Sequence, residues 1–126
     1  MRRTAPVALL VADETGVPAV LQRALEAAGY LVARATEDAA ARARIEQGDV
    51  GLVLLDLDLR RLDGLALCRH LRARPAARTV PLCVLSGRAD GDARAAAFAA
   101  GANHYLVKPI DAADLRGWLS TWREPR

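Results

Sequence analysis

Short apolar segments alternate with segments of helical spacing along the chain. Residues 7–12, VALLVA, form a continuous apolar run of the kind found in strands that are buried on both faces. Apolar residues then recur at helical spacing from Val17 to Ala28, and Gly29 follows, a residue type that commonly ends helices. The pattern therefore predicts a buried strand followed by a helix that ends at Gly29.

The same alternation is repeated four more times. Further strands are predicted over residues 30–35, 50–56, 80–86 and 104–108. Helices are predicted from about 36 to 47, over 64–74 and 92–101, and from Asp111 onward, where an apolar stripe is formed by Leu115, Trp118, Leu119 and Trp122. Five successive strand–helix units predict an α/β fold with a five-stranded parallel sheet and helices on both faces. The right-handed crossover rule favours a doubly wound (βα)5, flavodoxin-like arrangement.

Length and composition are those of one globular domain. The chain has 126 residues, of which 52% are hydrophobic and 26% charged, which excludes a disordered protein. The apolar run near the N-terminus reaches Asp13 and Glu14 without a convincing cleavage site, and no segment is long enough to span a bilayer. We therefore expect residues 1–126 to form a single domain without an output domain, in the cytoplasm and with no membrane partner.

The net charge of +3 comes mostly from arginines that are spread along the chain. Since no aromatic residues interleave with them, a solvated surface explains them better than a nucleic-acid interface, and we expect no direct nucleic-acid binding. Cys68 and Cys83 lie in apolar sequence and are expected to be buried, reduced thiols. The isolated His70 and His104 give no zinc-type spacing. Lys108 is the only lysine of the chain.

Polar side chains stand where four of the predicted strands end. They are Asp13 and Glu14 after the first strand, Asp56 and Asp58 at the third, Ser86 at the fourth and Lys108 at the fifth. Parallel strands bring these ends to one edge of the sheet, where carboxylates repel one another unless a cation joins them. Mg²⁺ suits the carboxylates, and a lysine and a hydroxyl beside it suit the oxygens of a phosphoryl group. Because the chain has no glycine-rich phosphate loop, the phosphoryl group would be held by these side chains or bonded to one of them.

Four motifs carry a family resemblance. They are LLVADE, LVLLDLDLRRLDG, VLSG and HYLVKP, in this order along the chain. Asp63 and Gly64 follow Asp56 at the spacing found after the phosphoacceptor of receiver domains. Ser86 stands where receiver domains have a hydroxyl group before a small residue. From about residue 7 to residue 122, the chain thus resembles the receiver domains of two-component response regulators.

The resemblance implies a phosphorylation reaction. Asp56 would accept a phosphoryl group from a phosphohistidine of a sensor histidine kinase or of a histidine phosphotransfer protein, and an acyl phosphate would form. Mg²⁺ would be the cofactor, held by the carboxylates of Asp13 and Asp56 and by the backbone carbonyl of Asp58. Lys108 would neutralise phosphoryl oxygens, and Ser86 would move to bond one of them.

The resemblance also implies a switch that passes the signal on. Together with Ser86, Tyr105 would respond to phosphorylation, and its ring would turn inward. This would reshape the surface of the fourth helix, the fifth strand and the fifth helix, and so control a downstream protein partner through a shift in a pre-existing equilibrium. The peptide bond between Lys108 and Pro109 is expected to be cis. The protein would be a signalling phosphoacceptor rather than an enzyme.

Two positions depart from the pattern of the family, and two others, Asp58 and Arg88, are positions that vary in receiver domains. Ala12 replaces the first of two acidic residues that usually end the first strand in the family, so Mg²⁺ binding is expected to be weaker than with the full pair. Arg60 stands where receiver domains commonly have proline. Asp58 and Arg88 flank the site with opposite charges. We expect these two residues to tune dephosphorylation by pairing over the phosphoryl group, which would slow the attack of water.

Two other functions fit parts of the sequence. A pseudo-receiver, which is a protein-binding module of the same fold that is not phosphorylated, would explain Ala12, whereas the retained carboxylates, hydroxyl and lysine favour a phosphorylatable site. The segment LVLLDLDL also looks like the nucleophile motif of haloacid-dehalogenase-type phosphatases, with Asp58 as the general acid. This phosphatase is the weaker alternative, because the chain has no cap segment and no acidic pair on a later strand end.

Overall fold

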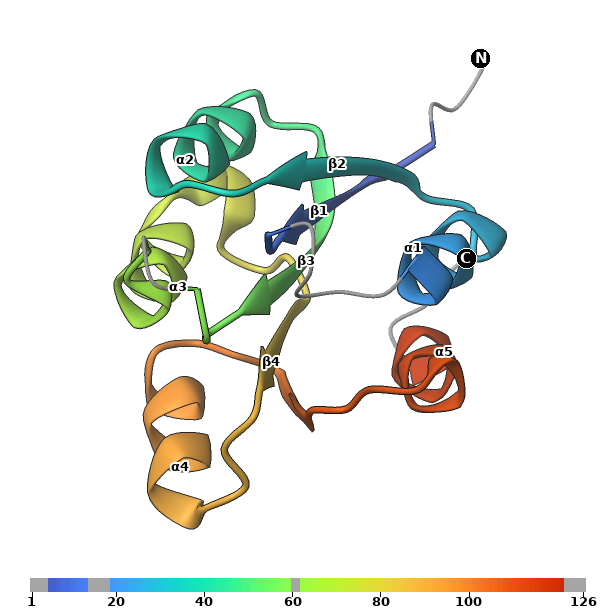
Figure 1. Cartoon of the computed structure of the whole chain (residues 1–126). Helices are drawn as coiled ribbons and strands as arrows, with labels where there is room; N and C mark the ends of the chain where they lie inside the picture. The colour runs from blue at the N-terminus through green and yellow to red at the C-terminus, as the bar shows by residue number, and fades with distance from the viewer. Residues whose placement is uncertain (1–4, 14–18, 60–61, 122–126) are drawn as a thin grey trace.

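The computed structural model describes residues 5–13, 19–59 and 62–121, and this part of the chain contains one parallel sheet of five strands. The strands are β1 (Val7–Val11), β2 (Leu31–Ala35), β3 (Val50–Asp56), β4 (Leu82–Ser86) and β5 (His104–Val107). Their order across the sheet is β2-β1-β3-β4-β5, and all neighbouring pairs are parallel. Figure 1 shows the sheet between two groups of helices. The predicted α/β, doubly wound, flavodoxin-like fold is confirmed.

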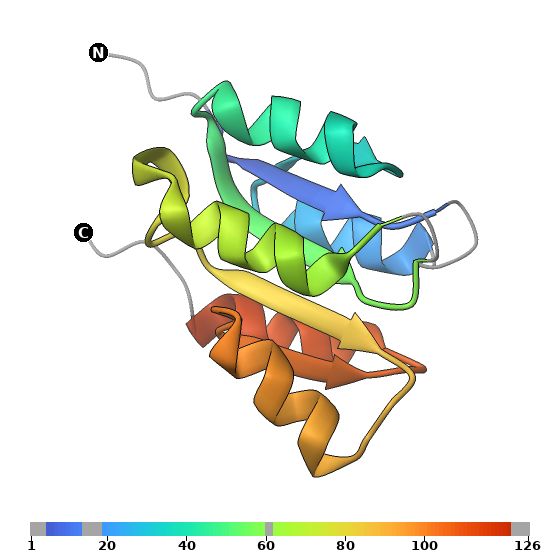
Figure 2. The same cartoon turned by 90° about the vertical axis from the view of Figure 1, so that its left-hand side faces the viewer.

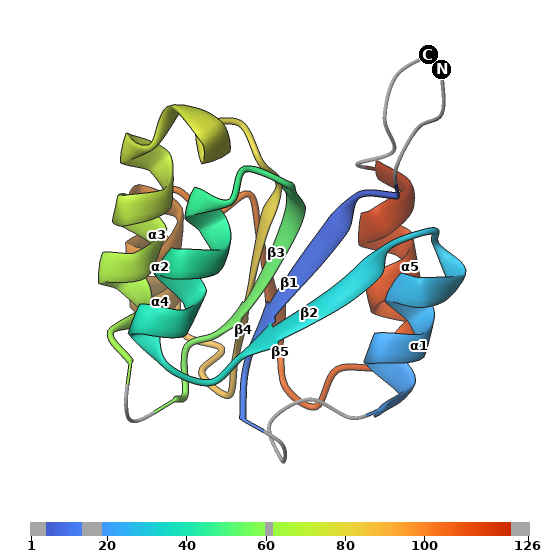
Figure 3. The ribbon, with the colours of Figure 1, turned by 90° about the horizontal axis from the view of Figure 1, so that it is seen from above.

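Helices cover both faces of this sheet. They are α1 (Ala19–Ala27), α2 (Asp38–Glu46), α3 (Gly64–Ala73), the short 3₁₀-helix η1 (Pro75–Ala77), α4 (Gly91–Ala99) and α5 (Ala112–Thr121). Figure 3 shows that α1 and α5 lie on one face of the sheet and that α2, α3 and α4 lie on the other. In Figure 2 the strand arrows point toward one edge, so the carboxyl ends of the strands gather there.

Alternate residues of the strands contribute to two hydrophobic cores. All of β1 is buried, which explains why its sequence is apolar at every position. Leu10 packs in one core with Leu25 of α1 and Trp118 of α5. Its neighbour Leu9 packs in the other core with Leu67 of α3. Apolar side chains therefore pack on both faces of the sheet. Among the described residues, the two buried polar ones, Asp56 and Ser86, each lie at the end of a strand.

Aspartates and a glycine set several helix ends. The carboxylates of Asp63 and Asp90 accept hydrogen bonds from the backbone N–H groups of Ala66 and Ala93, at 3.0 Å and 3.1 Å, and cap α3 and α4. Gly29, after α1, has a φ of +99°, in the left-handed region that favours glycine. These local signals explain why the predicted helix boundaries lie within a few residues of the observed ones.

The segment between α3 and β4 differs from the prediction. Pro75 does not only end α3 but begins η1, and β4 starts at Leu82 rather than at residue 80. The backbone N–H of Val80 donates to the carbonyl of Ala77 at 3.3 Å, so it forms a turn rather than a strand bond. No helix in the described ranges is long and apolar enough to cross a membrane. Val17, the first position of the first predicted helix, and Trp122, the last position of the predicted apolar stripe, lie outside the described residues.

The two cysteines are buried, as predicted, and each is a free thiol. Burial raises the pKa of the Cys68 thiol to about 11 and also raises the pKa of Cys83. Both side chains therefore remain protonated near neutral pH and act as small apolar groups within the cores.

Candidate functional site

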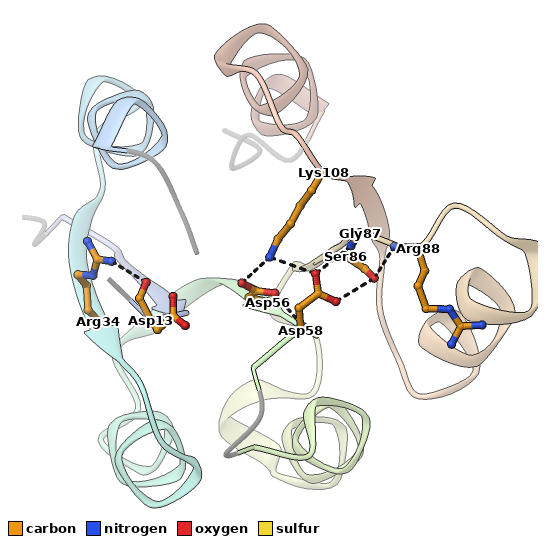
Figure 4. Close-up of polar contacts among 8 residues, drawn as sticks. All are labelled: Asp13, Arg34, Asp56, Asp58, Ser86, Gly87, Arg88 and Lys108. Atoms are coloured by element: carbon orange, nitrogen blue, oxygen red, sulfur yellow. Dashed lines mark hydrogen bonds and ion pairs between the residues drawn. The ribbon is translucent and has the colours of Figure 1, made fainter. Parts of the chain in front are cut away.

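The predicted site residues meet where the strands end. β1 and β3 are neighbours in the sheet, but α1 and α3, which follow them, lie on opposite faces (Figure 3). Open parallel sheets usually bind ligands at such a reversal of the chain direction. Asp13 follows β1 and Asp56 ends β3, while Ser86 ends β4 and Lys108 follows β5 (Figure 4). The topology thus brings the four predicted residues to one edge.

Asp56 is the buried carboxylate of this group, with an exposed fraction of 2%. Its Oδ1 accepts a hydrogen bond of 2.8 Å from the backbone N–H of Asp58, two residues along the turn that follows β3. Its Oδ2 accepts a hydrogen bond of 2.7 Å from Nζ of Lys108. Because a backbone N–H holds one oxygen and an ammonium holds the other, the carboxylate is fixed in one orientation in spite of its burial.

Lys108 reaches the site from the end of β5. Its backbone N–H donates to the carbonyl of Ser86 at 2.8 Å, which joins the ends of β4 and β5. Its ammonium contacts Oδ2 of Asp56 at 2.7 Å and Oδ2 of Asp58 at 3.2 Å. Partial burial lowers the pKa of Lys108, but hydrogen bonds and charges of the two aspartates outweigh this effect and raise the pKa above its ordinary value. The ammonium of Lys108 therefore stays protonated near neutral pH and supplies the site with a positive charge.

Asp58 points its side chain toward the ends of β4 and β5 (Figure 4). Its Oδ2 accepts a hydrogen bond of 2.9 Å from the backbone N–H of Gly87, and its Oδ1 lies 3.5 Å from Oγ of Ser86. The backbone N–H of Arg88 donates to the same Oγ at 3.1 Å. The exposed side chain of Asp58 thus contacts the hydroxyl of Ser86, the last residue of β4, and the backbone N–H of Gly87, which follows it.

The two residues that follow β1 are a buried alanine and an exposed aspartate. Asp13 is exposed, and Figure 4 shows its side chain on the side of Asp56 that is remote from Lys108. Ala12 is fully buried among the apolar residues that face α1 and α5, and its backbone N–H donates to the carbonyl of Ala35 at 3.1 Å. The position that usually holds an acidic residue is therefore part of the core in this chain.

The side chains of Asp58 and Arg88, which we predict to pair over a phosphoryl group, have other partners in this structure. The guanidinium of Arg88 instead donates to both carboxylate oxygens of Asp90, at 3.0 Å and 2.9 Å. Asp90 is the nearer carboxylate because it lies two residues further along the same loop. The hydrogen bonds between the two side chains raise the pKa of Arg88 and lower the pKa of Asp90. An effect of Arg88 on dephosphorylation stays a prediction.

Tyr105 is already turned inward. Its exposed fraction is 3%, and its hydroxyl donates a hydrogen bond of 2.7 Å to the backbone carbonyl of Arg88. The guanidinium of Arg94, on α4, lies 5.2 Å from the centre of the ring. We predicted that the ring turns inward on phosphorylation, and in the structure it is inward, held by this hydrogen bond and by its packing. A switching role of Tyr105 stays a prediction.

A cavity of about 290 Å³ lies between the loop after β3 and the first turns of α4. Its lining residues include Asp58, Ser86, Arg88, Ala93, Ala96 and Tyr105. The small side chains on the α4 wall leave this space open. The site therefore has free volume directly beside Asp58, on the side that faces α4.

The oxygen atoms at this edge fit a hard divalent cation. Asp56 and Asp58 share the ammonium of Lys108, and Asp13 adds a third carboxylate on the other side of Asp56, so the edge carries more carboxylates than ammonium groups (Figure 4). Among the described residues, no three His, Cys, Asp or Glu side chains are grouped as a metal site. A set of two carboxylates, one backbone carbonyl and several waters, which is typical of Mg²⁺, does not need such a group.

Sequence reasoning missed two contributors to the site. The backbone N–H of Gly87 carries no side-chain signal, and only the fold shows that it faces Asp58. Arg34, on β2, donates to the backbone carbonyl of Asp13 at 3.4 Å, and nothing in the local sequence of β2 indicates this contact. Glu14 and Arg60, which the sequence singled out, lie outside the described residues.

Comparison with known proteins agrees with this geometry. A family model described as the response regulator receiver domain matches residues 8–120. The transcriptional regulatory protein PrrA of Mycobacterium tuberculosis is 39% identical over 112 residues, which are 89% of this chain and 47% of PrrA. The chain thus spans about half the length of this curated relative.

Two solved structures illustrate the similarity of the fold. A response regulator from Chloroflexus aurantiacus has a TM-score of 0.83 and 32% sequence identity, and the match covers 94% of this chain and 97% of that one. The receiver domain of the sensor histidine kinase PA1611 from Pseudomonas aeruginosa has a TM-score of 0.81 and 31% identity, covering 94% of this chain and 98% of that one. The latter structure is described with a magnesium ion coordinated in its active-site cleft.

Proposed function

The chain belongs to the response regulator receiver domain family, and from this we propose that it is a phosphoacceptor in a two-component or phosphorelay system. Asp56 takes a phosphoryl group from a phosphohistidine of a sensor histidine kinase or of a histidine phosphotransfer protein. The observation that carries the proposal is the contact of 2.7 Å between the buried Asp56 carboxylate and Nζ of Lys108. It sets a nucleophile beside a cation that suits phosphoryl oxygens.

In the proposed reaction, a carboxylate oxygen of Asp56 attacks the phosphorus atom. A P–O bond forms and the P–N bond to the partner's imidazole breaks; the electron pair stays on that ring nitrogen, and the other ring nitrogen carries the proton, so neutral imidazole leaves. The products are an acyl phosphate on Asp56 and a free imidazole in the partner. The fixed orientation of Asp56 favours this step, because the turn after β3 and Lys108 already direct both oxygens.

Three donors of this chain stabilise the charge of the phosphoryl group in the proposal. Lys108 supplies a compact positive charge, which suits a single phosphoryl oxygen better than the wide guanidinium of an arginine. Ser86 supplies a hydroxyl, and Gly87 supplies a backbone N–H next to it. All three lie at the ends of β4 and β5, on the side of the site away from Asp13 (Figure 4).

We propose Mg²⁺ as the cofactor, held by the carboxylates of Asp13 and Asp56 and by the backbone carbonyl of Asp58. When bound, the ion would neutralise carboxylate and phosphoryl charge. Support comes from the excess of carboxylates in the site and from the magnesium described for the PA1611 receiver domain. With Ala12 in place of an acidic residue, we expect the affinity for Mg²⁺ to be lower than in receiver domains with the full pair.

The output of the proposed switch is the surface of α4, β5 and α5. Tyr105 lies between the site and this surface, since its hydroxyl bonds the carbonyl of Arg88, directly after Gly87. The structure holds the ring in this inward position, and we expect the phosphoryl group to favour it through a shift in population. A downstream protein partner would respond to this change.

A cytoplasmic location stays a prediction. The lack of direct nucleic-acid binding also stays a prediction, since PrrA, which is about twice as long as this chain, is named a transcriptional regulatory protein.

A pseudo-receiver that only binds proteins is the second candidate function. The observation in its favour is Ala12, which is fully buried and contributes no oxygen to the site. The contacts of Asp56 and Lys108 favour phosphorylation instead, since a module used only for binding does not need a nucleophile and a cation at 2.7 Å.

Intact mass separates these two candidates. The protein is incubated with Mg²⁺ and a small phosphodonor such as acetyl phosphate, with the Asp56→Asn variant as the control. We expect a gain of one phosphoryl group in the wild type and none in the variant. The absence of an Asp56-dependent adduct at high Mg²⁺ would favour the pseudo-receiver.

A further inference from the structure

The side chain of Asp58 engages three hydrogen-bond donors at once. Its carboxylate lies 3.2 Å from Nζ of Lys108, accepts the backbone N–H of Gly87 at 2.9 Å, and lies 3.5 Å from Oγ of Ser86. These groups are an ammonium, an amide and a hydroxyl, and they converge on one anion (Figure 4). They are also the three donors that the proposed function assigns to a phosphoryl group on Asp56.

A carboxylate and a phosphoryl group are alternative acceptors for these donors. Both are anions with oxygen acceptors, and both form short, charge-assisted hydrogen bonds. Lys108 contacts Oδ2 of Asp56 as well as Oδ2 of Asp58, so a group that is bonded to Asp56 lies within reach of the same ammonium. Two anions cannot accept the same proton of the Gly87 amide equally well.

We propose that the carboxylate of Asp58 is an internal competitor that occupies the phosphoryl-binding donors before phosphorylation and must be displaced by the phosphoryl group. This inference rests on the function proposed above and adds the residue that sets how readily the site accepts a phosphoryl group. Asp58 is a positioning residue here, since it acts through Lys108, Gly87 and Ser86.

The surroundings of Asp58 allow its side chain to move away. Its side chain is 43% exposed, and it borders the cavity of about 290 Å³ beneath α4. Arg88 borders the same cavity, but its guanidinium is already paired with Asp90, so the displaced carboxylate would turn toward the cavity and solvent. The backbone of Asp58 does not need to move, and its N–H can keep its bond to Asp56.

Beryllium fluoride, which mimics a phosphoryl group on aspartate, tests the competition directly. The full chain and its Asp58→Asn and Asp58→Ala variants are titrated with the probe in the presence of saturating Mg²⁺. The ¹H–¹⁵N resonance of the Gly87 amide is followed, because this donor changes its acceptor. Loss of a charge-assisted acceptor should lower the half-saturating probe concentration at least about fivefold in both variants.

Asp92→Asn is the matched control, because Asp92 is an exposed aspartate of α4 that does not line the site cavity. The control should titrate like the wild type. The gain of the Asp58 variants should persist at about 1 M salt, where a Debye length near 3 Å screens distant charges but leaves direct contacts. A gain that disappears at high salt, or that Asp92→Asn reproduces, would overturn the competition and leave only general repulsion.

Unchanged or weaker probe binding in both Asp58 variants, with a wild type that responds to the probe, would overturn this inference and leave the proposed function standing. A wild type and variants that all fail to respond would overturn the proposed function, and this inference with it. The variants should fold, since the side chain they remove is exposed and lies outside both cores.

Discussion

Ala12 is fully buried next to Asp13, at the position where the family resemblance predicts the first of two acidic residues. Counting the register from Asp13 to Gly29 identifies Ala12 as the replaced position, and its weakening effect on Mg²⁺ binding stays a prediction. The sequence did not predict the contacts of Asp58, since the rotamer of a loop side chain depends on donors that are distant in the sequence. The anions of the site could thus be identified from the sequence, but their partners could not.

The Ala12→Asp substitution should restore a carboxylate beside Asp13 and strengthen Mg²⁺ binding. We expect an affinity about tenfold higher, which corresponds to ~1.4 kcal/mol, because a carboxylate next to Asp13 in the chain adds negative charge near the cation. Calorimetric titration with MgCl₂ measures the effect, with Asp56→Asn in the same background as a control that should bind the ion more weakly. Equal affinity of Ala12→Asp and the wild type would contradict the account of this position.

The buried thiols should make the free energy of unfolding fall at alkaline pH. Burial raises the pKa of Cys68 from 9.0 to about 11, so between these values the unfolded chain loses a proton that the folded chain keeps. Stability is therefore fully present below pH 9 and decreases by up to about 1.4 kcal/mol per pH unit for this thiol. Urea unfolding at several pH values from 8 to 10 tests this. The Cys68→Ala variant should show a shallower slope, and an identical slope would count against the assignment.

At the scale of elements, the ends of α3, η1 and α4 are joined by one arginine. Arg72 donates from Nε to the carbonyl of Gly101 at 2.9 Å and from Nη1 to the carbonyl of Val80 at 2.7 Å. Its Nη2 donates to the side chain of Asn103 at 2.7 Å. The hydropathy pattern predicted α3 and α4 because each has a buried apolar side and an aspartate that caps its first turn. It could not predict η1 or this cluster, because a single polar side chain holds them together.

The Gly101→Ala substitution should destabilise the protein at this junction. Gly101 has a φ of +116°, and a Cβ atom there would lie 2.5 Å from Cγ of Arg72. Strain and displacement of the arginine should cost about 1–3 kcal/mol of unfolding free energy. Chemical denaturation gives the value, with Gly117→Ala as the control.

Gly117 lies within α5, and a Cβ atom there meets no other atom within 4 Å. Alanine at this position should therefore stabilise the helix by about 0.5–1 kcal/mol. If both alanine variants unfolded at the same denaturant concentration, the close packing of Gly101 against Arg72 would not matter to stability.

At the scale of the whole molecule, the topology could be predicted and explains the site. Five strand–helix units, each with its own apolar pattern, fix the strand order, and the order brings Asp13, Asp56, Ser86 and Lys108 to one edge. The state of the switch could not be predicted in this way. The inward position of Tyr105 depends on a hydrogen bond to a loop carbonyl, and such a contact leaves no periodic signal in the sequence.

The central claim is that Asp56, and no other carboxylate at this edge, accepts the phosphoryl group. Borohydride reduces an acyl phosphate to an alcohol, which converts a phosphorylated aspartate into homoserine and marks its position in the chain. After incubation with acetyl phosphate and Mg²⁺, we predict homoserine at position 56 alone, by mass spectrometry of the peptides. Homoserine at position 13 or 58, or at no position, would contradict the account.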